Sequence, residues 1–244
     1  MTVGAIIQAR MGSSRLPGKA LADIAGVPML GRVVDRVKQA HTIGTVVVAT
    51  TTKQRDDGLG AYAATLDVEV YRGDEDDVLD RYYQAATLHK LDVIVRITSD
   101  CPLIDPGLAD RVIQPLLAPG SQVDYSANTL RRTFPRGLDV EAVPLGTLAR
   151  VWREARSTHE RAHVFPYIYE HPDRFQMVGI TDPVDRSHMR WTVDTDEDLM
   201  FVRRVCGALG ARDFTWKDVL NLLEAQPDLL RINAMVHQKS AHDL

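Results

Sequence analysis

The chain has 244 residues, of which 45% are hydrophobic and 25% charged, and its formal net charge is −4. This profile is typical of a globular protein and excludes a disordered, collagen-like or coiled-coil chain. A net negative charge supplies no overall attraction for nucleic acid, so no nucleic-acid partner is expected. The cysteines Cys101 and Cys206 lie far apart in the sequence, which supports neither a disulfide framework nor a structural zinc site.

The N-terminal segment lacks the pattern of a secretory signal, and no apolar run approaches the roughly 18 residues that a membrane span requires. We therefore expect a cytoplasmic protein with no membrane partner. A chain of this length is expected to form a single domain, over residues 1–244, with a full hydrophobic core. The acidic residues between 53 and 80 are interpreted mostly as a solvated face around helix ends.

Short apolar runs alternate with amphipathic segments along the first hundred residues. The pattern predicts strands at 3–9, 45–50, 68–71 and 92–97, and helices between Pro28 and Gly44, at 56–66 and at 77–88. Such alternation indicates a parallel sheet with helices on both faces, which binds ligands beyond the carboxyl ends of its strands. The second half is less regular, with strands predicted at 139–143 and 175–180 and helices at 146–155, 160–170, 197–209 and 216–225.

The loop after the first predicted strand has the composition of a phosphate-binding loop. It reads ARMGSSRLPGK and contains Arg10, Arg15 and Lys19 but no acid. Small residues let backbone N–H groups approach an anion, and the three cations can offset the charge of a triphosphate. The loop is not a Walker A motif, because the glycine spacing is one residue too long and Ala20 replaces the magnesium-binding hydroxyl. A flexible basic loop is the alternative interpretation.

Two aspartates follow predicted strands and are candidates for one metal site. Asp100 comes after the strand at 92–97, where a carboxylate is costly to bury without a cation. Asp194 is predicted to end a short apolar strand, just before the helix at 197–209. A helix N-cap at Thr195 or Asp196 explains one polar residue there but does not explain Asp194. The pair Asp100 and Asp194 therefore predicts a magnesium site beside the phosphate loop.

Six segments together resemble a known family. They are IIQARMGSSRLPGKAL, RGDEDDVLDRYY, RITSDCPLIDP, FPRGLDVEAV, RWTVDTDEDL and NAMVHQKS. In this order they resemble the cytidylyltransferases of spore coat polysaccharide biosynthesis, which are related to the acylneuraminate and 3-deoxy-manno-octulosonate cytidylyltransferases. The resemblance implies a Rossmann-like α/β fold of the glycosyltransferase-A type, with a mixed, mainly parallel sheet. It also implies a homodimer, with acceptor-binding and dimerisation elements at about 120–190.

The resemblance further assigns roles to individual residues. It implies that Lys19, Arg10 and Arg15 are catalytic, and that Asp100 and Asp194 bind Mg²⁺ or Mn²⁺. The nucleotide-binding residues that it implies are Gln8, Ala9, Arg10, Gly12, Ser13, Ser14, Arg15, Lys19, Thr50, Thr51, Arg72, Gly73 and Asp100. One departure is Ala20, because sialate-type relatives commonly have Asn after the signature lysine, so their substrate is not carried over.

The activity that the resemblance implies is transfer of CMP from CTP to an acidic, nonulosonate-like sugar, with release of pyrophosphate, for surface polysaccharide. Two alternatives stay open: a phosphorylated or phosphonate acceptor for the same chemistry, or a non-catalytic nucleotide-binding protein. A glycosyltransferase is disfavoured, because its metal-binding carboxylates need no basic N-terminal loop.

The acceptor pocket is expected in the second half of the chain. Its candidate residues are Asn128, Arg136, Asp139, Glu141 and His163. An acidic acceptor favours one bidentate arginine, but the sequence does not distinguish Arg131, Arg132 and Arg136. His159 and His163 lie one helical turn apart, and packing is favoured over zinc ligation for them because no cysteine is near.

Overall fold

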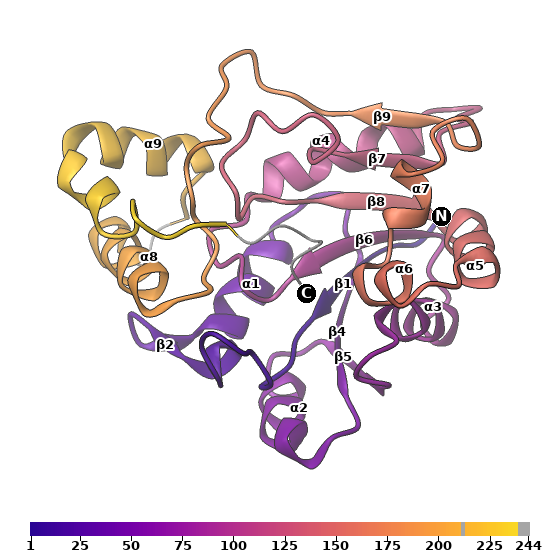
Figure 1. Cartoon of the computed structure of the whole chain (residues 1–244), viewed down its shortest axis with the longest axis horizontal. Helices are drawn as coiled ribbons and strands as arrows, with labels where there is room; N and C mark the ends of the chain where they lie inside the picture. The colour runs from indigo at the N-terminus through magenta and orange to yellow at the C-terminus, as the bar shows by residue number, and fades with distance from the viewer. Residues whose placement is uncertain (211–212, 239–244) are drawn as a thin grey trace.

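A seven-stranded sheet forms the centre of the computed structural model, which describes residues 1–210 and 213–238. Its strand order is β5-β4-β1-β6-β8-β7-β9. The strands are β1 (Val3–Gln8), β4 (Thr45–Thr51), β5 (Glu69–Gly73), β6 (Val93–Thr98), β7 (Tyr125–Ala127), β8 (Glu141–Pro144) and β9 (Met177–Gly179). Strand β8 pairs antiparallel with β6 and β7, and the other pairs are parallel (Figure 1). The predicted mixed, mainly parallel sheet is therefore confirmed.

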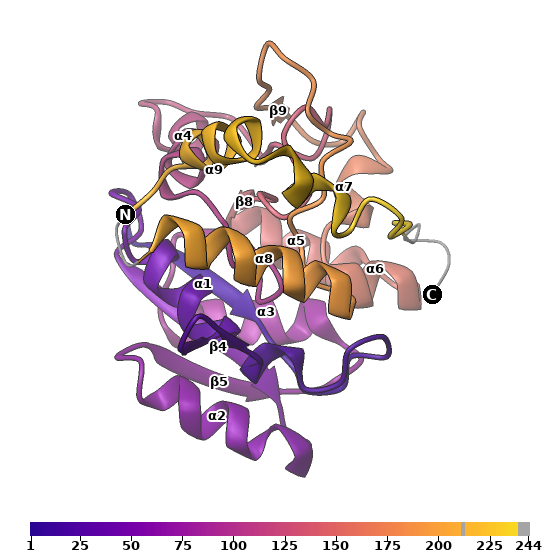
Figure 2. The ribbon, with the colours of Figure 1, turned by 90° about the vertical axis from the view of Figure 1, so that its left-hand side faces the viewer.

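Helices cover both faces of the sheet. On one face α1 (Met29–Val37), α2 (Asp57–Ala64) and α4 (Pro106–Leu117) pack into one apolar cluster. On the other face α3 (Val78–Leu88), α5 (Leu145–Glu154) and α7 (Pro166–Tyr169) form a second cluster, beside α6 (Thr158–His163). A third cluster holds α8 (Asp196–Leu209) and α9 (Trp216–Ala225), which lie along one side of the molecule (Figure 2).

The register of the parallel strands brings several chain ends to one edge. Gln8 pairs with Ala49 on β4 and with Thr98 on β6, and Thr51 pairs with Gly73 on β5. The loops that follow β1, β4, β5 and β6 therefore leave the sheet side by side. This is the edge at which parallel sheets bind ligands.

Most predicted elements are present, with boundaries shifted by one to three residues. The predicted helix at 160–170 is wrong in one respect, because Val164 has φ 78° and divides it into α6 and α7. The analysis of the sequence missed α4, which begins after the N-cap Asp105, and the three-residue strand β7. It also missed the small hairpin of β2 (Asp23–Ile24) and β3 (Val27–Pro28). None of the helices in the described residues is long and apolar enough to cross a membrane.

Gly137 joins two segments that lie near the same edge. Its φ is 102°, and an added Cβ would lie 2.6 Å from the backbone nitrogen of Thr192 and from the carbonyl carbon of Trp191. The neighbouring residue Arg136 accepts a hydrogen bond from the Trp191 amide at 2.7 Å and donates one to the Met189 carbonyl at 3.0 Å. The loop at 136–137 is thus packed directly against the backbone at 189–192.

We predict that Gly137→Ala lowers the free energy of unfolding by about 2 kcal/mol or more, because the positive φ is strained and the backbone contact is too short. Urea denaturation of both proteins measures the change. Gly207→Ala is the control, since Gly207 lies in α8 with no atom within 4 Å of an added Cβ. The control is expected to gain roughly 0.5–1 kcal/mol from helix propensity. Equal stability of Gly137→Ala and the wild type would contradict the close packing at 191–192.

Candidate active site

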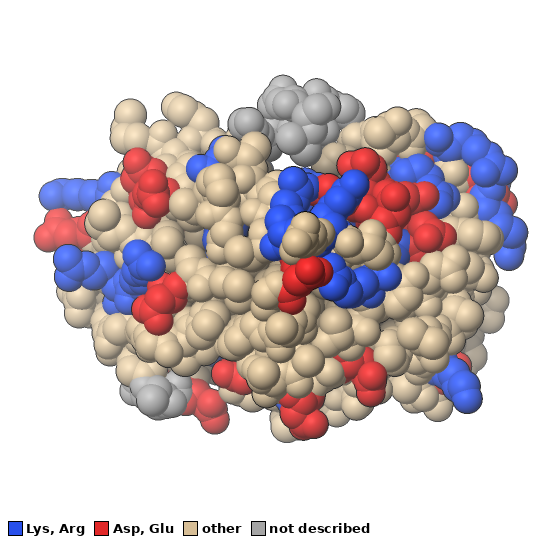
Figure 3. All heavy atoms as spheres, turned by 90° about the horizontal axis from the view of Figure 1, so that it is seen from below, with Lys and Arg blue, Asp and Glu red and all other residues tan. Residues whose placement is uncertain are grey.

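Asp56 fixes the base of the loop that follows β1. Its side chain is fully buried, Oδ1 accepts a hydrogen bond from the Met11 amide at 2.7 Å, and Oδ2 accepts one from the Thr51 hydroxyl. The loop is therefore tied to the end of β4. Asp56 belongs to the acidic stretch interpreted as mostly solvated, and this residue departs from that interpretation. Other acids of the stretch are exposed, such as Asp57, which pairs with Arg72. The face of the molecule seen from below carries acidic and basic side chains next to one another (Figure 3).

The same loop offers unpaired backbone donors. Within the described residues, the amides of Gly12, Ser14 and Arg15 donate to no acceptor. Gly18 has φ 76°, which turns the chain into the short helix η1 (Lys19–Leu21). Free N–H groups in a tight loop are the usual binding site for a phosphate group. The geometry thus agrees with the phosphate loop predicted from the sequence.

The ammonium of Lys19 brings the two predicted aspartates together. Its Nζ donates to Asp100 Oδ2 and to Asp194 Oδ1, at 2.9 Å each. A third bond goes to the Val193 carbonyl at 2.7 Å. The side chains of Lys19 and Asp194 are only 11% and 13% exposed, so these charges meet in a partly desolvated place.

The pKa values of this cluster reflect the shared charge. Burial alone would lower the pKa of Lys19, but Asp100 and Asp194 outweigh it and raise the pKa above its ordinary value. Burial would raise the pKa of Asp100, yet the ammonium of Lys19 and a hydrogen bond from Thr98 lower it to about 2. Lys19 and Asp100 are therefore both charged at neutral pH. The adjacent Cys101 thiol is buried, and burial together with Asp100 raises its pKa well above the ordinary value.

The second oxygen of Asp194 contacts two arginines. Oδ2 lies 2.9 Å from Arg15 Nη2 and 2.8 Å from Arg190 Nη2. Thr195 is the N-cap of α8, with a capping box completed by Asp198, so the choice left open between Thr195 and Asp196 falls on Thr195. Asp194 precedes the cap and is free for another role.

The remaining predicted catalytic cation, Arg10, lies at the mouth of the site. Its guanidinium is half exposed and stands 3.5 Å from Glu75, which Arg55 also contacts. Arg10, Arg15 and Lys19 are thus each paired with a carboxylate in this structure. A polyanionic ligand would replace these partners with phosphate oxygens.

Two carboxylates of the site, Asp100 and Asp194, are the candidates for holding a divalent cation. In the described part of the chain no three His, Cys, Asp or Glu residues form a metal-binding group. Asp100 and Asp194 nevertheless converge on one cation, the Lys19 ammonium. Mg²⁺ typically takes one or two carboxylates and completes its shell with water and substrate phosphates. The two aspartates beside the phosphate loop therefore fit Mg²⁺ or Mn²⁺ bound together with a nucleotide.

The predicted base-binding residues occupy the ends of β4 and β5. Thr50 is fully buried, and its hydroxyl has no hydrogen-bond partner in the described residues. Arg72 is committed elsewhere, because its guanidinium donates to the carbonyls of Thr51 and Lys53 and pairs with Asp57. The structure therefore gives Arg72 a role in holding the loop after β4, so it is not available for base recognition in this conformation.

Two more predicted residues lie at the end of β1. Gln8 Oε1 accepts from the Tyr82 hydroxyl and from Arg96 Nε, both at 3.3 Å. The Ala9 amide donates to the Ala49 carbonyl at 3.1 Å, which continues the sheet by one residue. Both residues thus line the edge from which the phosphate loop departs.

Arg81 is a candidate that the sequence analysis missed. It lies on α3, is 2% exposed, and its Nε and Nη1 atoms have no partner in the described residues. An added Cβ on Gly73 would lie 3.2 Å from the Cγ of Arg81, so this side chain stands directly behind the end of β5. Burial and the positive charge of Arg10 lower the pKa of Arg81. The sequence does contain a signal for this residue, because Arg81 falls on the otherwise apolar face of a predicted helix.

Three of the residues predicted to bind the acceptor substrate form their side-chain hydrogen bonds within the protein. Asn128 is 1% exposed and bonds the Leu138 carbonyl and the Val140 amide. Glu141 is buried, with one oxygen on Arg96 and the other on the Tyr125 hydroxyl. Asp139 accepts both terminal nitrogens of Arg132. The structure presents Asn128 and Glu141 as internal braces, because both are buried and the polar atoms of their side chains already bond within the protein.

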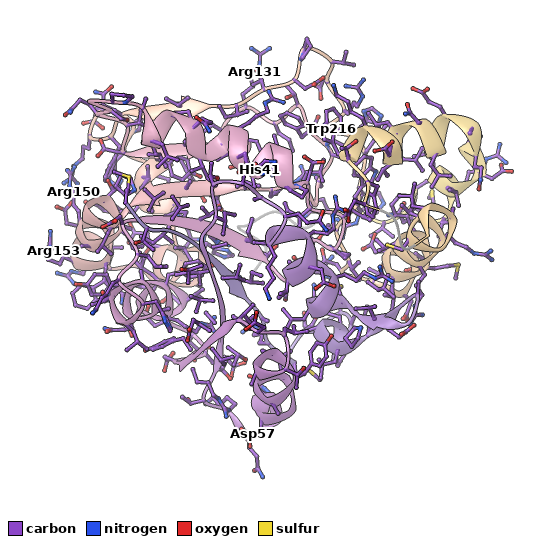
Figure 4. All side chains as sticks on the ribbon, turned by 180° about the vertical axis from the view of Figure 1, so that it is seen from behind. His41, Asp57, Arg131, Arg150, Arg153 and Trp216 are labelled. Carbon is purple, nitrogen blue, oxygen red and sulfur yellow. The ribbon has the colours of Figure 1, made fainter. Side chains whose placement is uncertain are left out.

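The structure distinguishes the three arginines that are candidates for binding an acidic acceptor. Arg132 is bidentate to Asp139, and Arg131 points outward from the molecule (Figure 4). The guanidinium of Arg136 has no hydrogen-bond partner in the described residues. Burial lowers the pKa of Arg136, and the positive charges of Arg132 and Arg190 lower it further. Asp139 opposes this lowering, so the feature that favours an anion here is the guanidinium of Arg136 itself.

His163 lies on α6, with its ring centroid 4.8 Å from that of His159. His159 in turn lies 3.6 Å from Glu170. The ring contact and the pair with Glu170 are packing contacts of the kind expected for these two histidines.

Comparisons with known proteins agree with this geometry. Residues 4–226 match the family model described as cytidylyltransferase. The chain is 35% identical to the spore coat polysaccharide biosynthesis protein SpsF of Bacillus subtilis, over 91% of this chain and 94% of that protein. It is 39% identical to a 3-deoxy-manno-octulosonate cytidylyltransferase of Geobacter sulfurreducens, over 48% of this chain and 46% of that one. A cytidylyltransferase structure from Leptospira borgpetersenii superposes with a TM-score of 0.91 at 33% identity, over 98% and 99% of the two chains.

We predict that Lys19→Met is less stable than the wild type at pH 7 in the presence of EDTA, because two carboxylates lose their shared cation. Lys19 holds the pKa of Asp100 at about 2, below the ordinary 3.8. This contribution is complete above the unfolded-state pKa and is lost as the pH falls from 3.8 through 2. The difference in urea midpoint between the two proteins is therefore expected to shrink over that pH range.

Lys53→Met serves as the control, since Lys53 is exposed and its ammonium contacts neither aspartate. A stability difference for Lys19→Met that stays constant from pH 7 to pH 3 would contradict the ion cluster.

Proposed function

This chain belongs to the cytidylyltransferase family, and on that basis we propose that it transfers CMP from CTP to an acidic sugar, with release of pyrophosphate, for surface polysaccharide. The observation that carries the proposal is the Lys19 ammonium held between Asp100 and Asp194, beside a loop with free amides. A purely nucleotide-binding protein would not need this buried cluster of charges.

In the proposed reaction an acceptor oxygen attacks the α-phosphorus of CTP. The new bond joins the acceptor oxygen to that phosphorus, and the bond from phosphorus to the bridging oxygen of the β-phosphate breaks. Negative charge grows on the departing pyrophosphate. Lys19, Arg10 and Arg15 are the cations that can neutralise it, and the loop amides can hold its oxygens. The attacking hydroxyl gives up its proton to solvent water as the CMP conjugate forms.

Asp100 and Asp194 are the residues that would hold Mg²⁺ or Mn²⁺. When bound, such an ion withdraws electron density from the phosphate oxygens that it contacts. Lys19 lies within reach of both the carboxylates and the loop, so its ammonium can exchange a carboxylate partner for a phosphate oxygen. Arg190 keeps one oxygen of Asp194 in place during such an exchange.

Arg81 supports a nucleotide whose pyrimidine base carries hydrogen-bond acceptors on its Watson–Crick edge. A guanidinium offers only donors, and the Nε and Nη1 atoms of Arg81 have no partner in the part of the chain that the structure describes. Cytosine presents a carbonyl oxygen and an unprotonated ring nitrogen next to each other, whereas uracil carries a proton on that nitrogen. A donor-only side chain behind the end of β5 therefore favours CTP over UTP.

The proposed acceptor class is an acidic, nonulosonate-like sugar. The relative from Geobacter sulfurreducens bears the name of a sugar acid cytidylyltransferase. The guanidinium of Arg136, which has no hydrogen-bond partner in the described part of the chain, is suited to a carboxylate. A phosphorylated or phosphonate acceptor would use the same guanidinium. The expectations of a homodimer with contacts within 120–190, and of a cytoplasmic location, stay predictions.

The first test of function is pyrophosphate release from each of the four nucleoside triphosphates, with a panel of sugar acids and phosphonates and with Mg²⁺ added. We expect turnover with CTP and a sugar acid. Asp100→Asn and Asp194→Asn are each expected to reduce turnover by roughly two orders of magnitude or more. The double variant is expected to be scarcely worse, because both residues serve one site and their effects do not add.

Asp196→Asn is the matched control, because Asp196 is the first residue of α8 and follows the cap. This variant is expected to keep most of the activity. Turnover with UTP or GTP but not CTP would refute the proposed nucleotide, and full activity of Asp194→Asn would refute the proposed ligand pair.

A second test concerns the acceptor. Arg136→Gln is expected to raise the KM for the sugar acid by about tenfold or more, with the KM for CTP nearly unchanged, because a charge-assisted contact to a carboxylate is lost. Arg131→Gln is the control, since Arg131 points away from the molecule (Figure 4). Equal acceptor KM values for the two variants would show that Arg136 does not bind the acceptor.

A further inference from the structure

The C-terminal segment at 232–238 returns to the active site. It follows the short helix η3 (Pro227–Arg231) and runs past α8 toward the edge where the parallel strands end (Figure 1). Asn233 is 7% exposed, and its Nδ2 donates to the Arg190 carbonyl at 2.9 Å and to Asp198 Oδ1 at 3.0 Å. Gln238 Oε1 accepts a hydrogen bond from Arg190 Nη1. The resemblance motif NAMVHQKS begins at this asparagine and has no role in the proposed reaction.

Arg190 connects this segment to the catalytic carboxylates. Its side chain is 8% exposed, and Nε and Nη2 donate to the two oxygens of Asp198 at 2.9 Å each. Nη2 also donates to Asp194 Oδ2 at 2.8 Å. Asp198 is fully buried and accepts from the Asp194 amide at 3.0 Å. All three nitrogens of the guanidinium are therefore engaged, one of them by the C-terminal segment.

We propose that residues 233–238 form a strap that positions Asp194 by holding Arg190. An arginine side chain has many rotamers, and fixing it on several sides removes most of that freedom. With Arg190 fixed, Oδ2 of Asp194 is held and Oδ1 faces Lys19 and the phosphate loop. Partners that orient a reacting or ligating group in this way commonly change activity by one or two orders of magnitude when they are removed. The inference rests on the proposed function, which gives Asp194 its task.

A strap differs from a segment that only covers apolar surface. A covering segment would affect the stability of the protein and leave the turnover of the folded enzyme unchanged. A strap acts on the orientation of Asp194, so its loss lowers kcat and leaves the KM for CTP nearly constant. A side chain that keeps the acceptor oxygen should restore the contact to Arg190.

The experiment compares Gln238→Ala, Gln238→Glu and the control Met235→Ala in the full chain with Mg²⁺. Met235 is 82% exposed and lies in the same segment. For Gln238→Ala we expect kcat to fall about tenfold while the KM for CTP stays within about twofold. Gln238→Glu retains an oxygen for Arg190 and is expected to approach wild-type kcat, as is Met235→Ala.

Hydrogen exchange of the backbone amides provides a readout that does not depend on activity. The amides of Asp194 and Thr195 both donate to Asp198 Oδ2. We expect faster exchange at 190–196 in Gln238→Ala, without a comparable change elsewhere, and an unchanged profile in Met235→Ala. Asn233→Ala is expected to produce the same local change.

The two proposals fail in different ways. Absence of turnover by the wild type with every triphosphate and acceptor would refute the proposed function, and hydrogen exchange would still decide the strap. Unchanged exchange at 190–196 in both Gln238→Ala and Asn233→Ala would overturn the strap. Wild-type kcat in both variants, with an active wild type, would overturn it as well.

Discussion

The site depends on one arrangement of charge, in which a buried ammonium neutralises two carboxylates that come from distant parts of the chain. Lys19 precedes Asp194 by 175 residues and Asp100 by 81. Removing such groups from water is costly, and the cost is offset only when each charge has a close partner of opposite sign. Every neighbouring element therefore has to hold its position, or an uncompensated charge would be left in a poorly hydrated place.

Polar contacts between loops and their neighbouring elements hold the charged groups in position, in addition to the packing of the helices. Asp56 hydrogen-bonds the first loop and the end of β4. The capping box at the start of α8 places Asp198 where it accepts hydrogen bonds from Arg190. Gly137 lets the chain after β7 approach the backbone that leads to Asp194. These contacts are local and polar, whereas the three apolar clusters stabilise the sheet as a whole. The apolar clusters therefore contribute most of the stability, and the polar contacts position the charged groups of the site.

Much of this organisation follows from the sequence by simple physical rules. Buried strands such as β4 and β6 show continuous β-branched runs, and amphipathic helices such as α3 show clear periodicity, so both were predictable. The pairing of Asp100 with Asp194 was predicted by placing both after strands. Asp100 does follow β6, but the strand predicted before Asp194 is wrong, because an irregular segment leads to that residue. Arg81 and Asn233 could not be found this way, because their roles depend on tertiary neighbours. The division of the helix at Val164 and the internal bonding of Glu141 are also tertiary effects, invisible to local pattern.

The position of Cys101 has a further chemical consequence. Its sulfur lies 3.6 Å from one oxygen of Asp100 and 3.2 Å from the Thr98 hydroxyl, and the side chain is buried. A thiol must ionise before it reacts readily with peroxides or alkylating reagents, and a neighbouring carboxylate opposes that ionisation. The thiol of Cys101, beside the ion cluster of Lys19, Asp100 and Asp194, is therefore a poor nucleophile at neutral pH. Changes in the oxidation state of the surroundings should consequently leave this centre intact.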